Sequence, residues 1–134
     1  MVYLLDTNTL NYVLKGVTPV LDQFEAAVAD AGARFVLSPV VHYEVERYLK
    51  LKNSTRLLRD YHTLVDVWEV IRFTTKDWET ASDLWAERHR AGTPITDADL
   101  LIAVSALKTE AILVTNNAGH FQDLGLALEN WAAP

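Results

Sequence analysis

Acidic and amide side chains stand beside the short apolar runs of this sequence. The group consists of Asp6, Glu44, Asp97, Asp99, Asn116 and Asn117. Oxygen donors of this kind, with no cysteine in the chain and no obvious histidine partner, suit Mg²⁺ or Mn²⁺. Carboxylates that are held close together repel one another unless a cation joins them. Two such cations can activate a water and stabilise both oxygens of an in-line phosphoryl displacement, so the chemistry indicated first is hydrolysis of a phosphate ester.

Strands and helices that alternate along the chain would position these side chains. Strands are predicted at residues 2–5, 34–37 and 112–115, within 68–73, and as a final edge strand at 126–131. Cap residues and apolar spacing predict the helices, and a loop is expected at 116–123. The helices should cover 7–15, closed by Gly16; Pro19 to about residue 31, capped by Thr18; Ser38 or Pro39 to 51; 53 or 54 to about 65; a segment capped by Thr75 that ends near Gly92; and 97–107.

This alternation predicts an α/β fold with a parallel sheet covered by helices on both faces. Ligands of such sheets bind beyond the carboxyl ends of the strands. Asp6 and Asn116 directly follow predicted strands, so we expect the acidic and amide group to converge at this edge.

Each member of the group also has a purely structural interpretation. Asp6 would cap the helix that follows its strand, and Glu44 would pair with Arg47 on an exposed helix face. Thr96 and Asp99 fit a capping box. The remaining members would favour a helix N-terminus or form turns: Asp97, Asn116 and Asn117. Only their shared position at the strand ends favours a functional site.

Four segments, in order, resemble the motifs of the PIN-domain family, and most closely the VapC-type toxins of bacterial toxin–antitoxin systems. They are residues 4–8 (LLDTN), 38–44 (SPVVHYE), 97–103 (DADLLIA) and 113–121 (LVTNNAGHF). The resemblance spans nearly the whole chain. It implies a single PIN domain over residues 1–134, with a three-layer α/β/α fold and a mostly parallel sheet of four to five strands.

The resemblance also implies roles for individual residues. Asp6, Glu44, Asp99 and Asn117 would be the catalytic residues. The three carboxylates would bind the metal, with Asp97 as an accessory metal ligand. The activity implied is Mg²⁺- or Mn²⁺-dependent hydrolysis of RNA that leaves a 5′-phosphate and a 3′-hydroxyl. Thr7 and Asn8 would orient Asp6, and Thr115 would hold the site from the sheet side. The supporting residues expected are therefore Thr7, Asn8, Thr115 and Asn116.

Asn117 departs from the pattern, because many PIN domains carry an aspartate at the aligned position. An amide oxygen can ligate a metal but adds no charge, so this residue puts the binding of a second ion in doubt. Two alternatives to a metal-dependent ribonuclease stay open: a catalytically silent PIN-fold module that binds RNA or protein, and a structure-specific DNA nuclease with the same site. A phosphatase of the haloacid-dehalogenase type would need a second aspartate where this chain has Asn8.

Basic residues gather between positions 47 and 59, although the formal net charge is −6. This cluster is the predicted RNA-binding surface, with three nearby tyrosines as stacking partners for bases. The alternative is that these cations solvate a pair of helices. The cluster contains Arg47, Lys50, Lys52, Arg56 and Arg59, and the tyrosines are Tyr43, Tyr48 and Tyr61.

Histidines and tryptophans are assigned to packing and surface roles. The four histidines lack metal-ligand spacing, and the four tryptophans are expected in the core. The resemblance implies a homodimer and a cognate antitoxin, against which apolar residues would be buried. The sets are His42, His62, His89 and His120; Trp68, Trp78, Trp85 and Trp131; and, for the partner surface, Tyr12, Val13, Val40, Tyr43 and Leu49.

Length and composition are those of one globular domain. The chain has 134 residues, half of them hydrophobic and 22% charged, and no cysteine, which excludes disulfides and thiolate metal sites. Residues 1–10 lack a basic start and contain Asp6, so no secretory signal is expected. No apolar run approaches the length of a membrane span. A cytoplasmic location is therefore expected.

Overall fold

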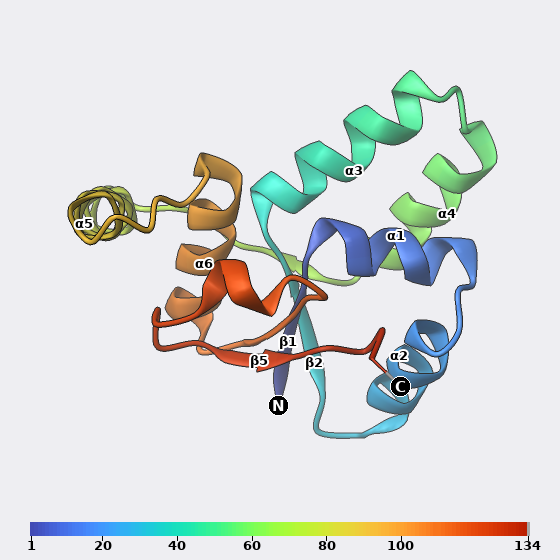
Figure 1. Ribbon diagram of the computed structural model, residues 1–134. Helices are drawn as coiled ribbons and strands as arrows, with labels where there is room; N and C mark the ends of the chain where they lie inside the picture. Colours follow the sequence, from blue (N-terminus) through green and yellow to red (C-terminus); the bar gives the residue numbers. More distant parts are fainter. Residues whose placement is uncertain (134) are drawn as a thin grey trace.

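A five-stranded parallel sheet forms the centre of the computed structural model, which describes residues 1–133 (Figure 1). The strand order is β3-β2-β1-β4-β5, and all four pairings are parallel. The predicted parallel α/β fold is therefore confirmed, with five strands. The strands are β1 (Val2–Leu5), β2 (Arg34–Leu37), β3 (Glu69–Val70), β4 (Ile112–Val114) and β5 (Ala127–Glu129).

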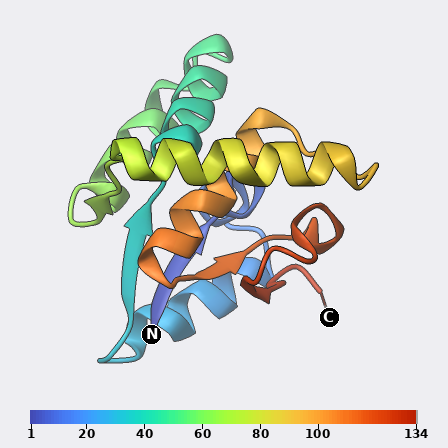
Figure 2. The ribbon, with the colours of Figure 1, turned by 90° about the vertical axis from the view of Figure 1, so that its left-hand side faces the viewer.

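Helices cover both faces of this sheet. One face carries α5 and α6, and Figure 2 shows α5 lying across α6; the other face carries α1 and α2, and α3 and α4 form a hairpin beyond the sheet. The helices are α1 (Thr7–Lys15), α2 (Val20–Ala29), α3 (Pro39–Leu51), α4 (Thr55–Val65), α5 (Thr75–Arg90) and α6 (Asp97–Thr109), with a 3₁₀ turn, η1 (Ala118–Phe121).

The order in which successive strands are added to the sheet reverses at β1. From β1 the chain builds β2 and then β3 on one side, and it returns later to place β4 on the other side. This topological switch point leaves a crevice at the carboxyl ends of β1 and β4, which is where open α/β sheets bind ligands. Leu5 is in register with Val114, so Asp6 and Thr115 leave the sheet side by side.

Buried aliphatic side chains of β1, β2 and β4 fill the sheet core, and Leu4, Val36 and Leu113 are almost inaccessible. An aromatic cluster packs between the sheet and α2. Phe35 stacks on Trp68 with ring centroids 5.1 Å apart, and Trp131 is 5% exposed. These contacts fix the sheet that carries the strand ends.

Side-chain caps begin three of the six α-helices at the predicted positions. Asp6 accepts a hydrogen bond from Thr9 N (2.9 Å) at α1, Ser38 from Val40 N (3.3 Å) at α3, and Thr96 from Asp99 N (3.2 Å) at α6. These caps satisfy backbone donors that a helix N-terminus leaves unpaired.

Several predicted boundaries were wrong. Thr18 does not cap α2: Pro19, in right-handed helical backbone and without a side-chain acceptor, takes that position. The same helix ends at Ala29, because Asp30 is extended and its carboxylate accepts from Gly32 N at 3.3 Å, forming a turn.

At the start of α5 the cap is Thr74, one residue before the predicted Thr75, because Thr74 and Asp77 form a reciprocal capping box. Toward the C-terminus, β4 ends at Val114, α6 continues to Thr109, and the expected loop at 116–123 contains η1.

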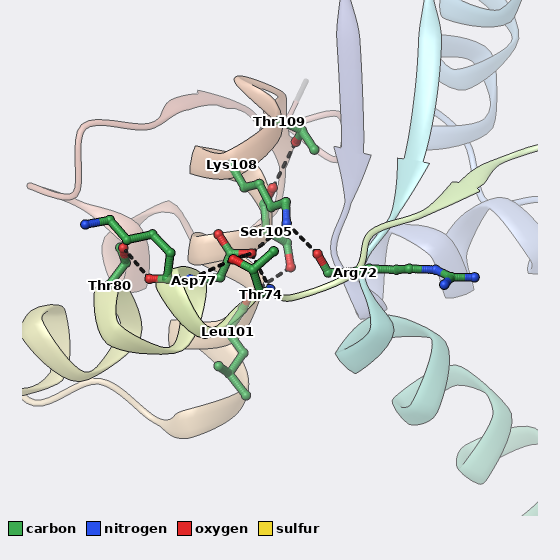
Figure 3. Close-up of polar contacts among 9 residues, drawn as sticks. Arg72, Thr74, Asp77, Thr80, Leu101, Ser105, Lys108 and Thr109 are labelled. Carbon is green, nitrogen blue, oxygen red and sulfur yellow. Dashed lines mark hydrogen bonds and ion pairs between the residues drawn. The ribbon is translucent and has the colours of Figure 1, made fainter.

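A lysine connects α5 and α6 to the end of β3 (Figure 3). Lys108 Nζ donates to the carbonyl oxygen of Arg72 and to Asp77 Oδ2, the latter at 2.6 Å. Asp77 also accepts from Thr74 N at 2.7 Å. One carboxylate therefore holds both the α5 cap and the lysine of α6.

Some side-chain placements also differ from expectation. Trp78 and Trp85 are 52% and 44% exposed rather than buried, because α5 buries only its Ala81 face against α6. Tyr61, expected to stack on bases, is fully buried. Val13 and Leu49 fill this chain's own core and are unavailable to a partner. None of the helices in residues 1–133 has both the length and the apolar character needed to cross a membrane.

Candidate active site

Asp6 stands at the switch point as a buried carboxylate with 6% exposure. Burial raises its pKa above the ordinary value, and the nearby charge of Asp99 raises it further. Hydrogen bonds from Thr115 and Thr9 act in the opposite direction and favour the ionised form. The fold therefore holds a desolvated acid next to a second acid, which is unfavourable unless a positive charge is shared between them.

Glu44 is positioned by α1 and by its own helix. Thr7 Oγ1 donates to Glu44 Oε1 at 2.7 Å, and Arg47 Nη2 lies 3.5 Å from Glu44 Oε2. Thr7, which was expected to orient Asp6, is therefore bonded to Glu44. The residue that bonds Asp6 from α1 is Thr9, which the sequence analysis missed. Its signal was the N3 position of the helix that Asp6 caps.

Asp99 lies in the first turn of α6, where its backbone N–H is bonded to Thr96. Its Oδ2 is 3.1 Å from Nδ1 of His120, an exposed side chain in η1. His120 was assigned to the surface or to packing, and its contact with a candidate catalytic acid was missed. Its only sequence signal was its place in the fourth motif.

Thr115 and two asparagines, Asn116 and Asn117, follow directly after β4. Thr115 is fully buried, and its hydroxyl oxygen accepts from Asn117 N at 3.0 Å. Asn117 is exposed just before η1. Asn116 Oδ1 is buried and has no hydrogen-bond partner in the described part of the chain. An unpaired buried acceptor is costly, so this oxygen has capacity for a cation or a polar ligand.

Asp97 and Asn8 are more peripheral. Asn8 is exposed on α1. Asp97 is exposed too, and it lines a hollow between α5 and α6 together with Trp78 and Trp85. The structure thus places Asp97 beside α5, two residues before Asp99 in the first turn of α6.

Within residues 1–133, no three acidic or histidine side chains already form a cluster close enough to hold a metal ion. The donor chemistry nevertheless fits a hard cation. Asp6 is desolvated, Asp99 acts on it as a like charge, and the Asn116 oxygen is unpaired. Carboxylate and amide oxygens are the donors that Mg²⁺ and Mn²⁺ prefer.

Two hollows are lined by other residues of the candidate site. The larger, of about 620 Å³, is bordered by Thr7, Asn8 and Glu44 and runs between α1 and α3. The smaller, of about 200 Å³, is lined by Thr96, Asp99 and His120 among others. Glu44 and Asp99 therefore each border a hollow that could hold part of a substrate.

Comparison with known proteins identifies one family, which matches nearly the whole chain. The PIN domain family model matches residues 3–125. Ribonuclease VapC2 of Rickettsia felis is 30% identical over 136 residues, which cover 98% of each chain.

Solved structures give the same result. A chain in the crystal structure of VapBC2 from Rickettsia felis, bound to a DNA fragment from their promoter, is 28% identical with a TM-score of 0.84, over 98% of this chain and 99% of that one. A chain in the structure of VapBC-1 from nontypeable Haemophilus influenzae is 25% identical with a TM-score of 0.83, over 99% and 100% of the two chains.

Proposed function

Because the chain belongs to the PIN-domain family, we propose that it is an endoribonuclease and the toxin of a toxin–antitoxin pair. This proposal rests on the buried Asp6 at the switch point, with Asp99 close to it. Glu44 is held by Thr7 and borders the hollow between α1 and α3. A relative named as a ribonuclease and matched over 98% of both chains supports RNA as the substrate.

Asp6, Glu44 and Asp99 would hold Mg²⁺ or Mn²⁺, with Asp97 and Asn117 as accessory ligands. When bound, such a cation supplies an activated water and positive charge opposite the scissile phosphate.

The chain's own residues position this chemistry. Thr115 and Thr9 fix the buried Asp6, Thr7 fixes Glu44, and His120 orients Asp99. The Arg47 guanidinium, 3.5 Å from Glu44, adds positive charge where phosphate oxygens gain negative charge. The cut leaves a 5′-phosphate and a 3′-hydroxyl.

The proposed partners are a cognate antitoxin and a second copy of the chain. VapBC complexes are among the solved structures that the chain resembles, and this supports the antitoxin. The exposed Trp78 and Trp85 beside Leu100 and Leu101 form an apolar surface of the kind that partners cover, which supports the homodimer. The proposed place of action is the cytoplasm, where RNA is present.

The first experiment measures cleavage of a mixed RNA pool that includes tRNA, with Mg²⁺, with Mn²⁺ and with a chelator. Asp6→Asn and Asp99→Asn are compared with the wild type and with Asp22→Asn, which makes the same change at an exposed position of α2. We expect cation-dependent cutting that the two site variants lose and the control keeps.

The other outcomes separate the rival functions. Binding of RNA without cutting under any condition would favour the silent binding module. The first variant to test for restored cutting would then be Asn117→Asp. Cutting of flapped DNA in preference to RNA would favour the structure-specific DNA nuclease.

A further inference from the structure

A groove leads away from the candidate active site between α1 and α3. Thr7 and Glu44 stand at one end, and Lys15 and Tyr48 line the groove farther along the two helices. A second hollow, of about 650 Å³, shares Lys15 and continues past Leu14 to Arg56 at the start of α4. Figure 1 shows α1 lying beneath the α3–α4 hairpin along this course. We call the two joined hollows the α1/α3 groove.

Three cations line the α1/α3 groove in a chain with a net charge of −6. Lys15 is exposed, forms no ion pair within the described residues, and lies over the Tyr48 ring with its Nζ 5.2 Å from the centroid. Arg47 and Arg56 have side chains that are 58% and 84% exposed. Each contacts one carboxylate, at 3.5 Å and 3.7 Å, and the Arg47 guanidinium also lies over the Tyr43 ring, 4.9 Å from its centroid.

The floor of the groove offers groups that match a nucleotide. Tyr12 and Tyr48 are half-buried and line it, and the Nζ of Lys15 lies over the Tyr48 ring. Asn11 also lines it, and its Oδ1 is buried with no hydrogen-bond partner in residues 1–133. That acceptor suits the N–H of a base or a ribose 2′-hydroxyl, the group by which proteins distinguish RNA from DNA.

The structure also divides the basic cluster that the sequence analysis treated as one surface. Arg47 and Arg56 line the groove. Lys50 Nζ instead lies 3.5 Å from Glu46, which also contacts His62 of α4 at 2.6 Å, and neither Lys50 nor Lys52 borders the groove. The ion pairs explain this division: Arg47 pairs with Glu44, which is bonded to Thr7 of α1, whereas Lys50 pairs with Glu46, which is bonded to His62 of α4.

We propose that the α1/α3 groove binds the single-stranded RNA next to the scissile phosphate, an inference that rests on the proposed ribonuclease function. Lys15, Arg47 and Arg56 contact successive phosphates, and Tyr48 and Asn11 contact the base and the ribose between them. RNA is favoured over an acidic protein segment because the groove opens directly at Thr7 and Glu44, so a strand cut there must continue into it.

The test is fluorescence anisotropy of a labelled single-stranded RNA 12-mer, with chelator present so that nothing is cut. Lys15→Ala, Arg56→Ala and the double variant are compared with Lys50→Ala and Lys52→Ala, which remove the same charge outside the groove. Since each phosphate contact with a single strand contributes about 0.7 to the slope of log K against log salt, the double variant should lose about 1.4 of that slope. We expect its affinity to fall about tenfold or more at low salt, with the two controls close to wild type.

Tyr48→Phe and Tyr48→Leu test the stacking contact. Phenylalanine keeps the ring and should keep the affinity, whereas leucine should weaken it about fivefold or more, since a stacked base contributes about 1–3 kcal/mol. Equal losses in Lys15→Ala and Lys50→Ala would overturn the proposal, because binding would then follow net charge alone. Binding of polyglutamate that competes fully with the RNA at equal affinity would overturn it in favour of an acidic protein segment.

Cleavage assays keep this inference separate from the proposed function. If the groove binds RNA, Lys15→Ala should raise KM for the 12-mer, and the increase should be smaller for a dinucleotide, which fills less of the groove. If the protein binds RNA through the groove but cuts no RNA, the proposed ribonuclease function is overturned and the proposed binding site stands. If cutting depends on Asp6 but is insensitive to Lys15 and Arg56 at every RNA length, only the proposed binding site is overturned.

Discussion

Asp6 has a structural and a chemical role that conflict energetically. As the cap of α1 it must present an oxygen to Thr9 N, and an amide would do this equally well. Its negative charge is buried, and both burial and Asp99 raise its pKa. A neutral residue of the same shape would therefore suit the fold better, so the charge serves the function and reduces stability.

Asp6→Asn should abolish cleavage and raise the melting temperature at pH 7 in chelator. The sign follows from the raised pKa: the ionised form is disfavoured in the folded state, so the wild type loses stability as the pH rises through that pKa. The gain in the variant should disappear below the unfolded pKa of about 3.9, where both side chains are neutral. Thermal unfolding at pH 7 and pH 3.5 measures this, and a variant less stable than wild type at pH 7 would contradict it.

Thr7 has a single strong contact, with Glu44, that joins α1 to α3. Thr7→Val keeps the shape and removes the donor, so we expect cleavage to fall about 10- to 100-fold, as when the outer partner of a ligating side chain is lost. Thr7→Ser keeps the hydroxyl and should stay near wild type. Single-turnover cleavage with matched circular dichroism spectra measures the effect; equal activity of the valine and serine variants would mean that Glu44 needs no such support.

At the scale of the elements, polar connections hold α5 at both ends: Asp77 bonds Lys108 near its start, and Arg88 donates to the Gln122 carbonyl at 2.9 Å near its end. Its buried surface is small, with Ala81 as its one buried residue. Lys108 joins it to α6 and β3 through Asp77 and the Arg72 carbonyl (Figure 3). The lysine, followed by the Thr74 N–H, holds the pKa of Asp77 below its ordinary value.

Lys108→Met should lower stability at neutral pH and make stability less sensitive to acid. Because the folded pKa of Asp77 is depressed, its contribution is present above the unfolded pKa of about 3.9 and is lost as the pH falls through the folded pKa. The gap between wild type and variant should therefore narrow in acid. Urea unfolding at pH 7 and pH 2.5 measures the gap, and Lys76→Met, an exposed lysine of α5, is the control. A gap that persists unchanged in acid would show that the lysine acts through the Arg72 carbonyl or through packing and not through Asp77.

At the scale of the whole molecule, the two sides of the sheet have different surfaces. The α1/α3 groove is lined by cations and tyrosines, whereas the hollow between α5 and α6 is lined by Trp78, Trp85 and leucines, with Asp97 at its edge. The polar surface suits a nucleic acid, and the apolar surface suits a second copy of the chain. The proposed RNA substrate and the proposed second copy of the chain therefore occupy different faces.

Trp78→Ala with Trp85→Ala should convert a dimer to a monomer without unfolding it, because both side chains are about half exposed. Light scattering after size exclusion measures the mass, and Val28→Ala, 56% exposed on α2, is the matched apolar control. A wild type that is monomeric at high concentration, or a double variant that stays dimeric, would remove α5 as the dimer surface.

Short-range physics explains what the sequence alone determined. Apolar runs and the caps Asp6, Ser38 and Thr96 depend on neighbours within a few residues, so they predicted the strands and most helix starts. The alternation of the two predicted the parallel sheet. The position of Asp6 after a buried strand followed in the same way. The misplaced starts, at Thr18 and Thr75, are one-residue choices between adjacent caps, which local signals separate poorly.

Only the tertiary structure decided which side chains meet. Thr7 with Glu44 and Asp99 with His120 are partners 37 and 21 residues apart, and no local pattern encodes such distances. The exposure of Trp78, and the division of Arg47 from Lys50, depend on which face of a helix its neighbours cover. The residue type sets what a side chain can do, whereas the packing of helices against the sheet sets what it contacts.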